Sequence, residues 1–305
     1  MPGTRRTISG LLNINKPKGI TSHDVVARVR RLSRQRKVGH AGTLDPMATG
    51  VLLVCLGQAT RLIEYLMTGR KQYRATIRFG TTTDTLDADG QVVTQKDPTG
   101  LTESQLRGLL PAFQGDIKQL PPIFSALKQG GQPLYKRARA GQAIEVEPRP
   151  VTIHALTWGA WHPPDLTLDV VCSPGTYIRA LARDLGEATG LGAHLSELTR
   201  TASGSWSVAD AVPLAVLEHE ADWQAYLHSP DRAIAHLPRV TLDDESAWQV
   251  AQGQQTCLEA TSGSMDTFDL VRAYTPSGQF LAILTRVEPD DKLWRPKKVF
   301  NLGEP

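Results

Sequence analysis

The sequence has few of the residues that build disulfide frameworks and zinc sites. Its 305 residues include three cysteines, Cys55, Cys172 and Cys257, which lie far apart in the chain. Secreted domains that rely on disulfides carry paired cysteines, and zinc sites carry Cys or His at close spacing. An odd, scattered set is typical of a reducing compartment, so we interpret these cysteines as thiols of the core.

Long apolar runs are also missing. No stretch approaches the roughly 20 apolar residues that a membrane-spanning helix needs. The first segment, Met1–Ser9, contains no apolar signal region. We therefore expect a protein that stays in the cytoplasm and has no membrane partner.

Motifs for nucleotide cofactors and metals are incomplete. Gly190–Gly192 lacks the third glycine of the dinucleotide fingerprint because Leu195 stands at that position, and no Gly-Lys-Ser/Thr loop occurs. The acidic segment Asp84–Asp89 resembles a calcium loop, yet Thr85 and Lys96 occupy the first and last ligand positions of that frame. The sequence therefore predicts neither a cofactor nor a metal.

Charge is unevenly distributed along the chain. The net charge of +3 is too small to indicate a nucleic-acid partner by itself. Arginines and lysines nevertheless gather in Arg28–Lys37 and in a segment over about residues 124–150, whereas acidic residues gather near Asp243. Phosphate contacts would explain both basic runs, although such runs also occur on ordinary solvated faces.

The hydrophobic pattern predicts an α+β protein of two domains, over residues 1–237 and 238–305. Gln72–Phe79 alternates apolar and polar residues as a half-buried strand does, and Val51–Leu56 is a short apolar run typical of a buried strand or a buried helix. Ser22 is the expected N-cap of a helix that runs to Gln35. We also expect helices over about 60–67, 102–113 and 178–185, a mostly helical segment over 214–237, and short strands after Thr241.

Asp45 lies in a polar, glycine-rich loop, Gly39–Gly50. Pro46 disfavours the α conformation at Asp45, and the glycines permit tight backbone paths, so the carboxylate would project from a fixed loop. Loops held by rigid elements often carry function. Asp-Pro pairs also occur in ordinary turns, so the local pattern leaves open whether Asp45 reacts or only caps a turn.

Seven segments, in order, resemble the motifs of the TruB family of pseudouridine synthases, and the similarity extends over most of residues 10–205. The segments are Asn15–Ser22, Gly39–Gly50, Lys71–Arg74, Thr83–Gly90, Leu120–Lys128, Gly175–Arg179 and Arg295–Phe300.

This resemblance implies a fold, a reaction and a substrate. The implied fold is the pseudouridine-synthase fold, with a mixed, largely antiparallel sheet, followed by a small β-rich C-terminal domain of the PUA type. The implied reaction is the isomerisation of uridine 55 in the T loop of tRNA, without metal or cofactor. We expect the T arm of tRNA as the partner, no guide RNA, no obligate protein partner, and a monomer.

The resemblance also implies a catalytic pair. Asp45 matches the catalytic aspartate of the family, and Arg179 matches the arginine that pairs with it. An arginine partner would keep a partly buried carboxylate ionised and oriented. The sequence leaves open whether Asp45 first attacks the sugar, attacks the base or abstracts a sugar proton, and Arg179 read alone could be a solvated helix residue.

Further substrate-binding residues follow from the matched motifs. Tyr73 matches a tyrosine that stacks on the target base, and Leu198 matches a leucine that packs against it, although each could equally be a core residue. Tyr177 stands two residues before Arg179. His40 is expected to support the displaced T loop rather than bind a metal, and Lys16 belongs to the opening motif.

Two rival functions remain at this stage. A guide-RNA-dependent synthase would share the catalytic motifs, but such relatives usually lack the basic insertion of residues 124–150. A non-enzymatic tRNA-binding or folding factor would keep the pocket for recognition alone.

Asp87 is assigned either to a turn or to the organisation of the active-site loop.

Overall fold

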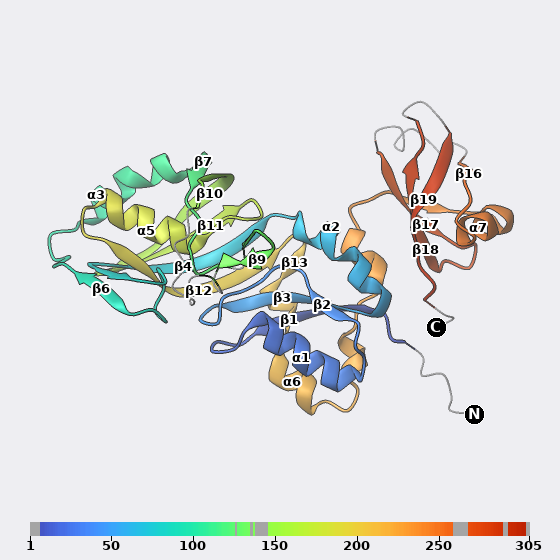
Figure 1. Ribbon diagram of the computed structural model, residues 1–305, viewed down its shortest axis with the longest axis horizontal. Coiled ribbons are helices and arrows are strands. Elements are labelled where there is room, and N and C mark those ends of the chain that lie inside the picture. The colour runs from blue at the N-terminus through green and yellow to red at the C-terminus, as the bar shows by residue number, and fades with distance from the viewer. Residues whose placement is uncertain are drawn as a thin grey trace.

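The computed structural model describes residues 7–125, 127–134, 137, 146–258, 268–288 and 292–302 (Figure 1). A ten-stranded sheet forms the larger unit. Its strands are β1 Gly10–Lys16, β2 Val38–His40, β3 Thr49–Leu56, β4 Lys71–Phe79, β7 Gly115–Gln119, β10 Arg149–His162, β11 Asp165–Cys172, β12 Ala193–Ser203, β13 Trp206–Ser207 and β14 Val212–Pro213.

The sheet follows the order β14-β1-β3-β12-β4-β11-β10-β7, with β2 paired to β3 and β13 paired to β12. The pairs β1–β14 and β3–β12 are parallel. The other pairs of this sheet are antiparallel. The expected mixed, largely antiparallel sheet is therefore confirmed.

Helices lie against this sheet and over its ends (Figure 1). The α-helices are α1 Ser22–Ser33, α2 Ile63–Met67, α3 Glu103–Leu109, α5 Ile178–Ala188 and α6 Leu214–His219. The 3₁₀ helices are η1 Gly57–Leu62, η2 Leu110–Phe113, η3 Val208–Asp210, η4 Trp223–Tyr226 and η5 Pro230–Ile234. No described helix is long and apolar enough to span a bilayer.

A smaller, β-rich unit follows and stands apart from the large sheet, as red ribbons in Figure 1. It contains β15 Arg239–Thr241, α7 Asp244–Ala251, β16 Thr256–Cys257, β17 Leu270–Tyr274, β18 Phe280–Arg286 and β19 Leu293–Val299. Its five strands follow the order β15-β17-β18-β19-β16. We propose that the domain boundary lies at residue 238, where the chain passes from one sheet to the other.

Two short hairpins complete the described elements: β5 Thr81–Thr83 with β6 Val92–Gln95, and β8 Lys128–Gln129 with β9 Gln132–Pro133. The second hairpin belongs to the basic segment expected over residues 124–150. Most of that segment between 135 and 145 lies outside the described residues, including Lys136 and Arg139, two of the basic residues expected there to contact phosphates.

The strand β4 shows why periodicity predicted this part of the fold well. Its burial alternates along the whole strand, and its buried apolar residues, Tyr73, Ala75, Ile77 and Phe79, face the core. Side chains of a strand alternate between its two faces, so a sheet with one buried face imposes this pattern.

The sequence predicted Ser22 as the N-cap of α1, but the cap is Thr21. Thr21 has the extended backbone of a cap, and its hydroxyl accepts a hydrogen bond from the Asp24 amide in a capping box. Ser22 instead buries its hydroxyl against Leu44, one residue before Asp45. Threonine and serine cap helices almost equally well, so tertiary contacts decided between these neighbours.

Two helix predictions need correction, whereas the segment 214–237 is mostly helical as expected, in the short pieces α6, η4 and η5. The helix expected over 60–67 begins as the 3₁₀ helix η1 and becomes α2. Helix α5 continues past Gly186 to Ala188. Gly186 is needed inside the helix because a Cβ there would lie 2.2 Å from the backbone nitrogen of Ala193, where β12 begins.

Candidate active site

A cavity of about 400 Å³ opens where the Asp45 loop meets the start of α5. Its wall includes five of the seven residues that the sequence singled out: Asp45, Tyr73, Tyr177, Arg179 and Leu198. They come from a loop, two strands of the sheet and one helix terminus. The cavity is within the size range of sites that bind small molecules and extruded bases.

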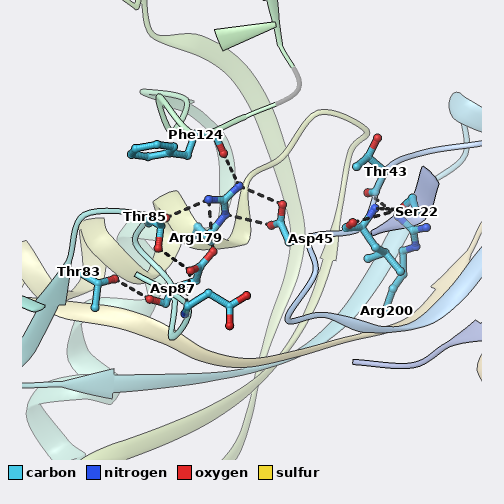
Figure 2. A network of polar contacts seen from close by, with 11 residues as sticks. Ser22, Thr43, Asp45, Thr83, Thr85, Asp87, Phe124, Arg179 and Arg200 are labelled. Carbon is cyan, nitrogen blue, oxygen red and sulfur yellow. Dashed lines mark hydrogen bonds and ion pairs between the residues drawn. The ribbon is translucent and has the colours of Figure 1, made fainter. Parts of the chain in front are cut away.

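Asp45 and Arg179 form a two-point ion pair at the cavity wall (Figure 2). The Arg179 Nε atom lies 3.0 Å from Oδ2 of Asp45, and its second terminal nitrogen lies 3.1 Å from Oδ1. The side chain of Arg179 is 6% exposed, whereas that of Asp45 is 32% exposed. The predicted pairing is therefore present, and the solvated-arginine interpretation of Arg179 is wrong.

Arg179 also binds three groups outside the Asp45 loop (Figure 2). It lies 3.4 Å from Oδ2 of Asp87 and donates to the carbonyl oxygens of Thr85, at 3.0 Å, and Phe124, at 2.9 Å. Phe124 begins the basic segment, so this arginine joins the Asp45 loop to the entrance of that segment. Fixed, fully bonded guanidinium groups hold a carboxylate in one orientation.

Asp87 combines the two roles considered for it. One carboxylate oxygen accepts hydrogen bonds from the Thr85 hydroxyl, at 2.6 Å, and from the Asp89 amide, at 3.1 Å, as in a polar turn. The other oxygen faces Arg179. Asp87 is buried, and its turn presents a second negative charge to the same guanidinium that binds Asp45.

These charges set the protonation of Asp45. Burial raises the pKa of its carboxyl above the ordinary value, the Arg179 guanidinium opposes this rise, and the Asp87 carboxylate adds to it. Desolvation disfavours the charged form of a carboxyl, and a nearby cation favours it. Arg179 therefore favours the ionised form of Asp45 and opposes the effect of burial.

Arg200 holds the backbone of the Asp45 loop from the opposite side. It is 1% exposed, and its guanidinium donates to the carbonyl oxygens of Val51, Thr43 and Gly42 at 2.7, 3.4 and 3.1 Å. Gly50 must be glycine here, since its φ is +99° and a Cβ would lie 2.2 Å from the Arg200 carbonyl oxygen. The loop is thus fixed through its main chain.

Arg200 was not singled out from the sequence, although a signal was present. It follows Leu198 by two positions on β12, and such residues share one face of a strand. An arginine in register with an apolar, buried leucine is a candidate for an internal contact, because arginine is almost never fully buried without partners.

Tyr73 and Leu198 are core residues that also reach the cavity. Tyr73 is 9% exposed and Leu198 is 7% exposed, and both belong to the main apolar cluster. Burial raises the pKa of the Tyr73 hydroxyl, and the nearby Arg200 guanidinium opposes this. The core and cavity interpretations of these residues are therefore compatible.

Tyr177 is held at the N-cap of α5 by its backbone. The Tyr177 backbone N–H donates to Oε1 of the buried Gln119 side chain at 3.0 Å. The Tyr177 carbonyl oxygen accepts from Nε2 of the same Gln119 side chain at 3.3 Å. This contact ties the helix terminus that carries Arg179 to the end of β7.

Lys16 and His40 do not line the cavity. Lys16 is fully buried and donates to the carbonyl oxygens of Pro17, Ile20 and Pro46, so it supports the residue after Asp45. Burial lowers the Lys16 pKa to about 8 and the His40 pKa to about 4. His40 packs edge-on against His23, with 5.4 Å between ring centres.

Lys71 lines the cavity and was also missed. It lies on the buried face of β4, two residues before Tyr73, is 6% exposed, and donates to the Leu66 carbonyl oxygen at 3.1 Å. Burial lowers its pKa to about 8. Among the described residues, no group of three or more His, Cys, Asp or Glu is placed to hold a metal ion.

Comparison with known proteins gives consistent matches. Residues 30–178 match the family model described as TruB family pseudouridylate synthase, N-terminal domain, and residues 179–246 match the model described as tRNA pseudouridylate synthase B C-terminal domain. The chain is 42% identical over 296 residues to the tRNA pseudouridine synthase B of Dehalococcoides mccartyi, covering 96% of this chain and 97% of that protein. It is 43% identical over 285 residues to the Thiobacillus denitrificans protein of the same name, covering 93% and 94%.

Solved structures share the fold. A Cbf5-Nop10-Gar1 complex contains a chain that is 26% identical to this one, with a TM-score of 0.72 and coverage of 95% of this chain and 84% of that chain. An H/ACA ribonucleoprotein bound to a substrate RNA contains a similar chain, 24% identical, with a TM-score of 0.70 and coverage of 96% and 85%. Sequence, fold and full-length relatives agree, and the chain belongs to the TruB family of pseudouridylate synthases.

Proposed function

We propose that this protein isomerises uridine to pseudouridine in tRNA, at position 55 of the T loop, without a guide RNA. Full-length relatives at 42% and 43% identity that are named tRNA pseudouridine synthase B support the activity and the RNA class. The observation that carries the proposal is the Asp45–Arg179 pair at the wall of a cavity that also contains Tyr73.

The reaction exchanges one bond to the sugar for another. The bond from N1 of uracil to C1′ breaks, a bond from C5 to C1′ forms, and the proton of C5 leaves while N1 gains one, so atoms and electrons balance. We propose Asp45 as the catalytic carboxylate. Whether it first attacks the sugar, attacks the base or takes a sugar proton, it must be ionised, and its pairing with Arg179 favours that form.

The remaining wall residues would hold the detached base. We propose that the base stacks on Tyr73 and packs against Leu198, with Tyr177 beside it. Aromatic and apolar surfaces suit a flipped pyrimidine and exclude water, which prevents loss of the free base. Lys16 would position the Asp45 loop, and His40 would contact the displaced T loop from β2.

Affinity would come from the basic surfaces. The helix α1 carries exposed arginines, and the segment over 124–150 adds further positive charge, so both can meet the phosphates of the T arm. We further propose that the protein acts as a monomer in the cytoplasm. Sedimentation at micromolar concentration would test the first of these statements, and fractionation of cells would test the second.

The guide-dependent rival shares the fold, as the Cbf5 likeness illustrates. The stand-alone form is favoured because the relatives named tRNA pseudouridine synthase B match nearly the whole chain at far higher identity. A purified protein that modifies a bare tRNA transcript would eliminate both this rival and a purely non-enzymatic factor.

The test is pseudouridine mapping on an unmodified tRNA transcript with wild type and with Asp45→Asn. We expect modification at position 55 by wild type, and a loss of at least about 10³-fold in Asp45→Asn with retained RNA binding. Asp97→Asn, at an exposed turn, is the matched control and should behave as wild type. Product from Asp45→Asn at the wild-type rate, or none from wild type, would overturn the proposal.

A further inference from the structure

The C-terminal unit packs against the segment that leads into the active-site cavity. This segment consists of η1 and α2, which lie on the side of the large sheet that faces the C-terminal unit (Figure 1). Leu62 and Leu66 of the segment belong to the same cluster of buried apolar residues as Ile283 and Phe300 of the C-terminal unit. Protein interiors are close-packed and compress little, so the position of one side of this contact constrains the other.

Polar contacts from the end of β19 hold the same segment. The Lys298 ammonium donates to the Arg61 carbonyl oxygen and forms an ion pair with the Glu64 carboxylate. The Arg61 guanidinium donates to the Val299 carbonyl oxygen and lies 5.0 Å from the centre of the Phe300 ring. Glu64 is exposed, and ion pairs at exposed sites contribute little, so the hydrogen bond to the Arg61 carbonyl oxygen is the main contact of Lys298.

The other end of α2 forms part of the cavity wall. Met67 is the last residue of this helix, lines the cavity and is 47% exposed. The Leu66 carbonyl oxygen accepts a hydrogen bond from the buried Lys71 ammonium at 3.1 Å, and Lys71 also lines the cavity. Glu64 and Met67 are three residues apart, within a single helical turn. The contacts of the C-terminal unit therefore act directly on the helix that presents Met67.

We propose that Met67 contacts the uracil base bound in the cavity, and that Lys298 positions Met67 through α2. The thioether of methionine is flexible and packs favourably against planar rings. This contact matters most after the base has separated from the sugar, because only non-covalent contacts with the wall then hold it. Lys298 is thus a positioning residue, and the C-terminal unit contributes to turnover as well as to any RNA affinity. The inference rests on the proposed function, because it assumes that uridine occupies the cavity.

The first test follows the Met67 methyl group by NMR in the full-length protein. The chain has four methionines, so labelling of their methyl groups with carbon-13 gives few resonances, and Met67→Leu identifies the one from Met67. A T-arm RNA hairpin added to Asp45→Asn should shift this resonance. Lys298→Leu should shift it without RNA, whereas Lys292→Leu, at an exposed lysine of the same unit, should not. A Met67 resonance that RNA leaves in place would refute the base contact, and one that Lys298→Leu leaves in place would refute the positioning.

The second test measures single-turnover rates of pseudouridine formation at saturating hairpin. We expect a rate about 10-fold lower for Met67→Ala and about 5-fold lower for Lys298→Leu. The dissociation constant of the hairpin should stay within about 2-fold of wild type in Lys298→Leu, and Lys298→Arg, which keeps a donor, should recover most of the rate. Weaker binding at an unchanged rate would mean that Lys298 only attracts RNA, and the inference would be wrong.

The third test combines the two substitutions. If Lys298 acts through Met67, the double variant Met67→Ala/Lys298→Leu should react about as slowly as Met67→Ala alone, because the positioned group is already absent. A general loss of stability would instead multiply the two effects, giving a rate about 50-fold below wild type. Multiplied effects would therefore exclude a positioning role for Lys298.

Pseudouridine formation by wild type separates this inference from the proposed function. If wild type modifies tRNA while Met67→Ala and Lys298→Leu keep the wild-type rate, the roles of these two residues are wrong and the enzymatic function stands. If wild type makes no pseudouridine in a tRNA transcript, the proposed function fails and the inference fails with it.

Discussion

Two buried arginines hold the Asp45 loop from opposite sides, and they do so in different ways. Arg179 meets two carboxylates, Asp45 and Asp87, as well as two carbonyl oxygens. Arg200 donates to three carbonyl oxygens and, among the described residues, forms no ion pair with a carboxylate. The first arginine can set the charge of Asp45, whereas the second can only set the position of the backbone.

A buried guanidinium can therefore affect a site in two separable ways, by changing the pKa of a carboxylate or by stabilising the backbone. Carboxylates near a guanidinium change their pKa, so loss of that guanidinium should change how activity depends on pH. Carbonyl oxygens do not titrate, so loss of an arginine that binds them should appear as lost stability. Substitutions on each side can therefore break or sharpen the comparison.

The largest effect on stability is expected from Arg200→Met. Three carbonyl oxygens would lose their donor in a buried place, which predicts a loss of about 3 kcal/mol in the free energy of unfolding. Urea denaturation measures this. Arg74→Met is the control, because Arg74 is exposed and pairs with Asp169 on the surface, where a salt bridge contributes about 0–1 kcal/mol. Equal losses of unfolding free energy in both variants would contradict the structural role assigned to Arg200.

Arg179→Gln should act on the reaction instead. We expect the rate of pseudouridine formation near neutral pH to fall about 10²- to 10³-fold. Without the guanidinium the pKa of Asp45 rises further, so the acidic limb of the pH–rate profile should move to higher pH. Arg183→Gln, on the same helix and paired with Asp184, is the control. An unmoved acidic limb would contradict the assignment of charge control to Arg179.

Asp87→Asn should shift the same limb the other way. The Asp87 carboxylate raises the pKa of Asp45, so its neutralisation lowers that pKa and moves the acidic limb to lower pH. We expect about a 10-fold lower rate at neutral pH, since Arg179 loses one of its fixed partners. Asp89→Asn, exposed on the same turn, should leave the profile unchanged. Shifts of the same sign in Arg179→Gln and Asp87→Asn would rule out this charge arrangement.

The smallest effect concerns Lys71, which is buried beside the same cavity. Its pKa is about 8 in the folded protein and near 10.5 when unfolded, so the unfolded chain binds more protons between these values and stability rises with pH there. Lys16 has the same property and adds to the slope. Lys71→Met should remove about 1 kcal/mol of the gain in unfolding free energy between pH 7.5 and 9, measured in urea. Exposed Lys118→Met should keep the wild-type slope.

Local patterns predicted the strands and the position of the Asp45 loop. The alternation in β4 and the apolar run in β3 follow from a sheet with buried faces, and both strands are where we expected them. The cap of α1 and the end of α5 were wrong, because Thr21 and Ser22 are both good caps and Gly186 is a plausible stop. Contacts with Leu44 and Ala193 decided these cases, and both contacts form only when the chain packs.

The site shows the same division. The motifs indicated Asp45, Tyr73 and Arg179 through resemblance, and the distances among them became visible only in the fold. Strand periodicity could have indicated Arg200 and Lys71, since each shares a strand face with a cavity residue two positions away. The role of a charged residue on a buried face cannot be predicted until its partners are known.

The sequence by itself determined the family, the α+β elements and the carboxylate on a glycine-rich loop, because these depend on residue types and spacings along the chain. The tertiary structure brings Arg179 to Asp45 across 134 positions, a pair that the sequence indicated only by resemblance, and it alone decided that Arg200 holds the loop from the other side. The physical reason is that burial and charge act over a few ångströms of space, whatever the separation along the chain.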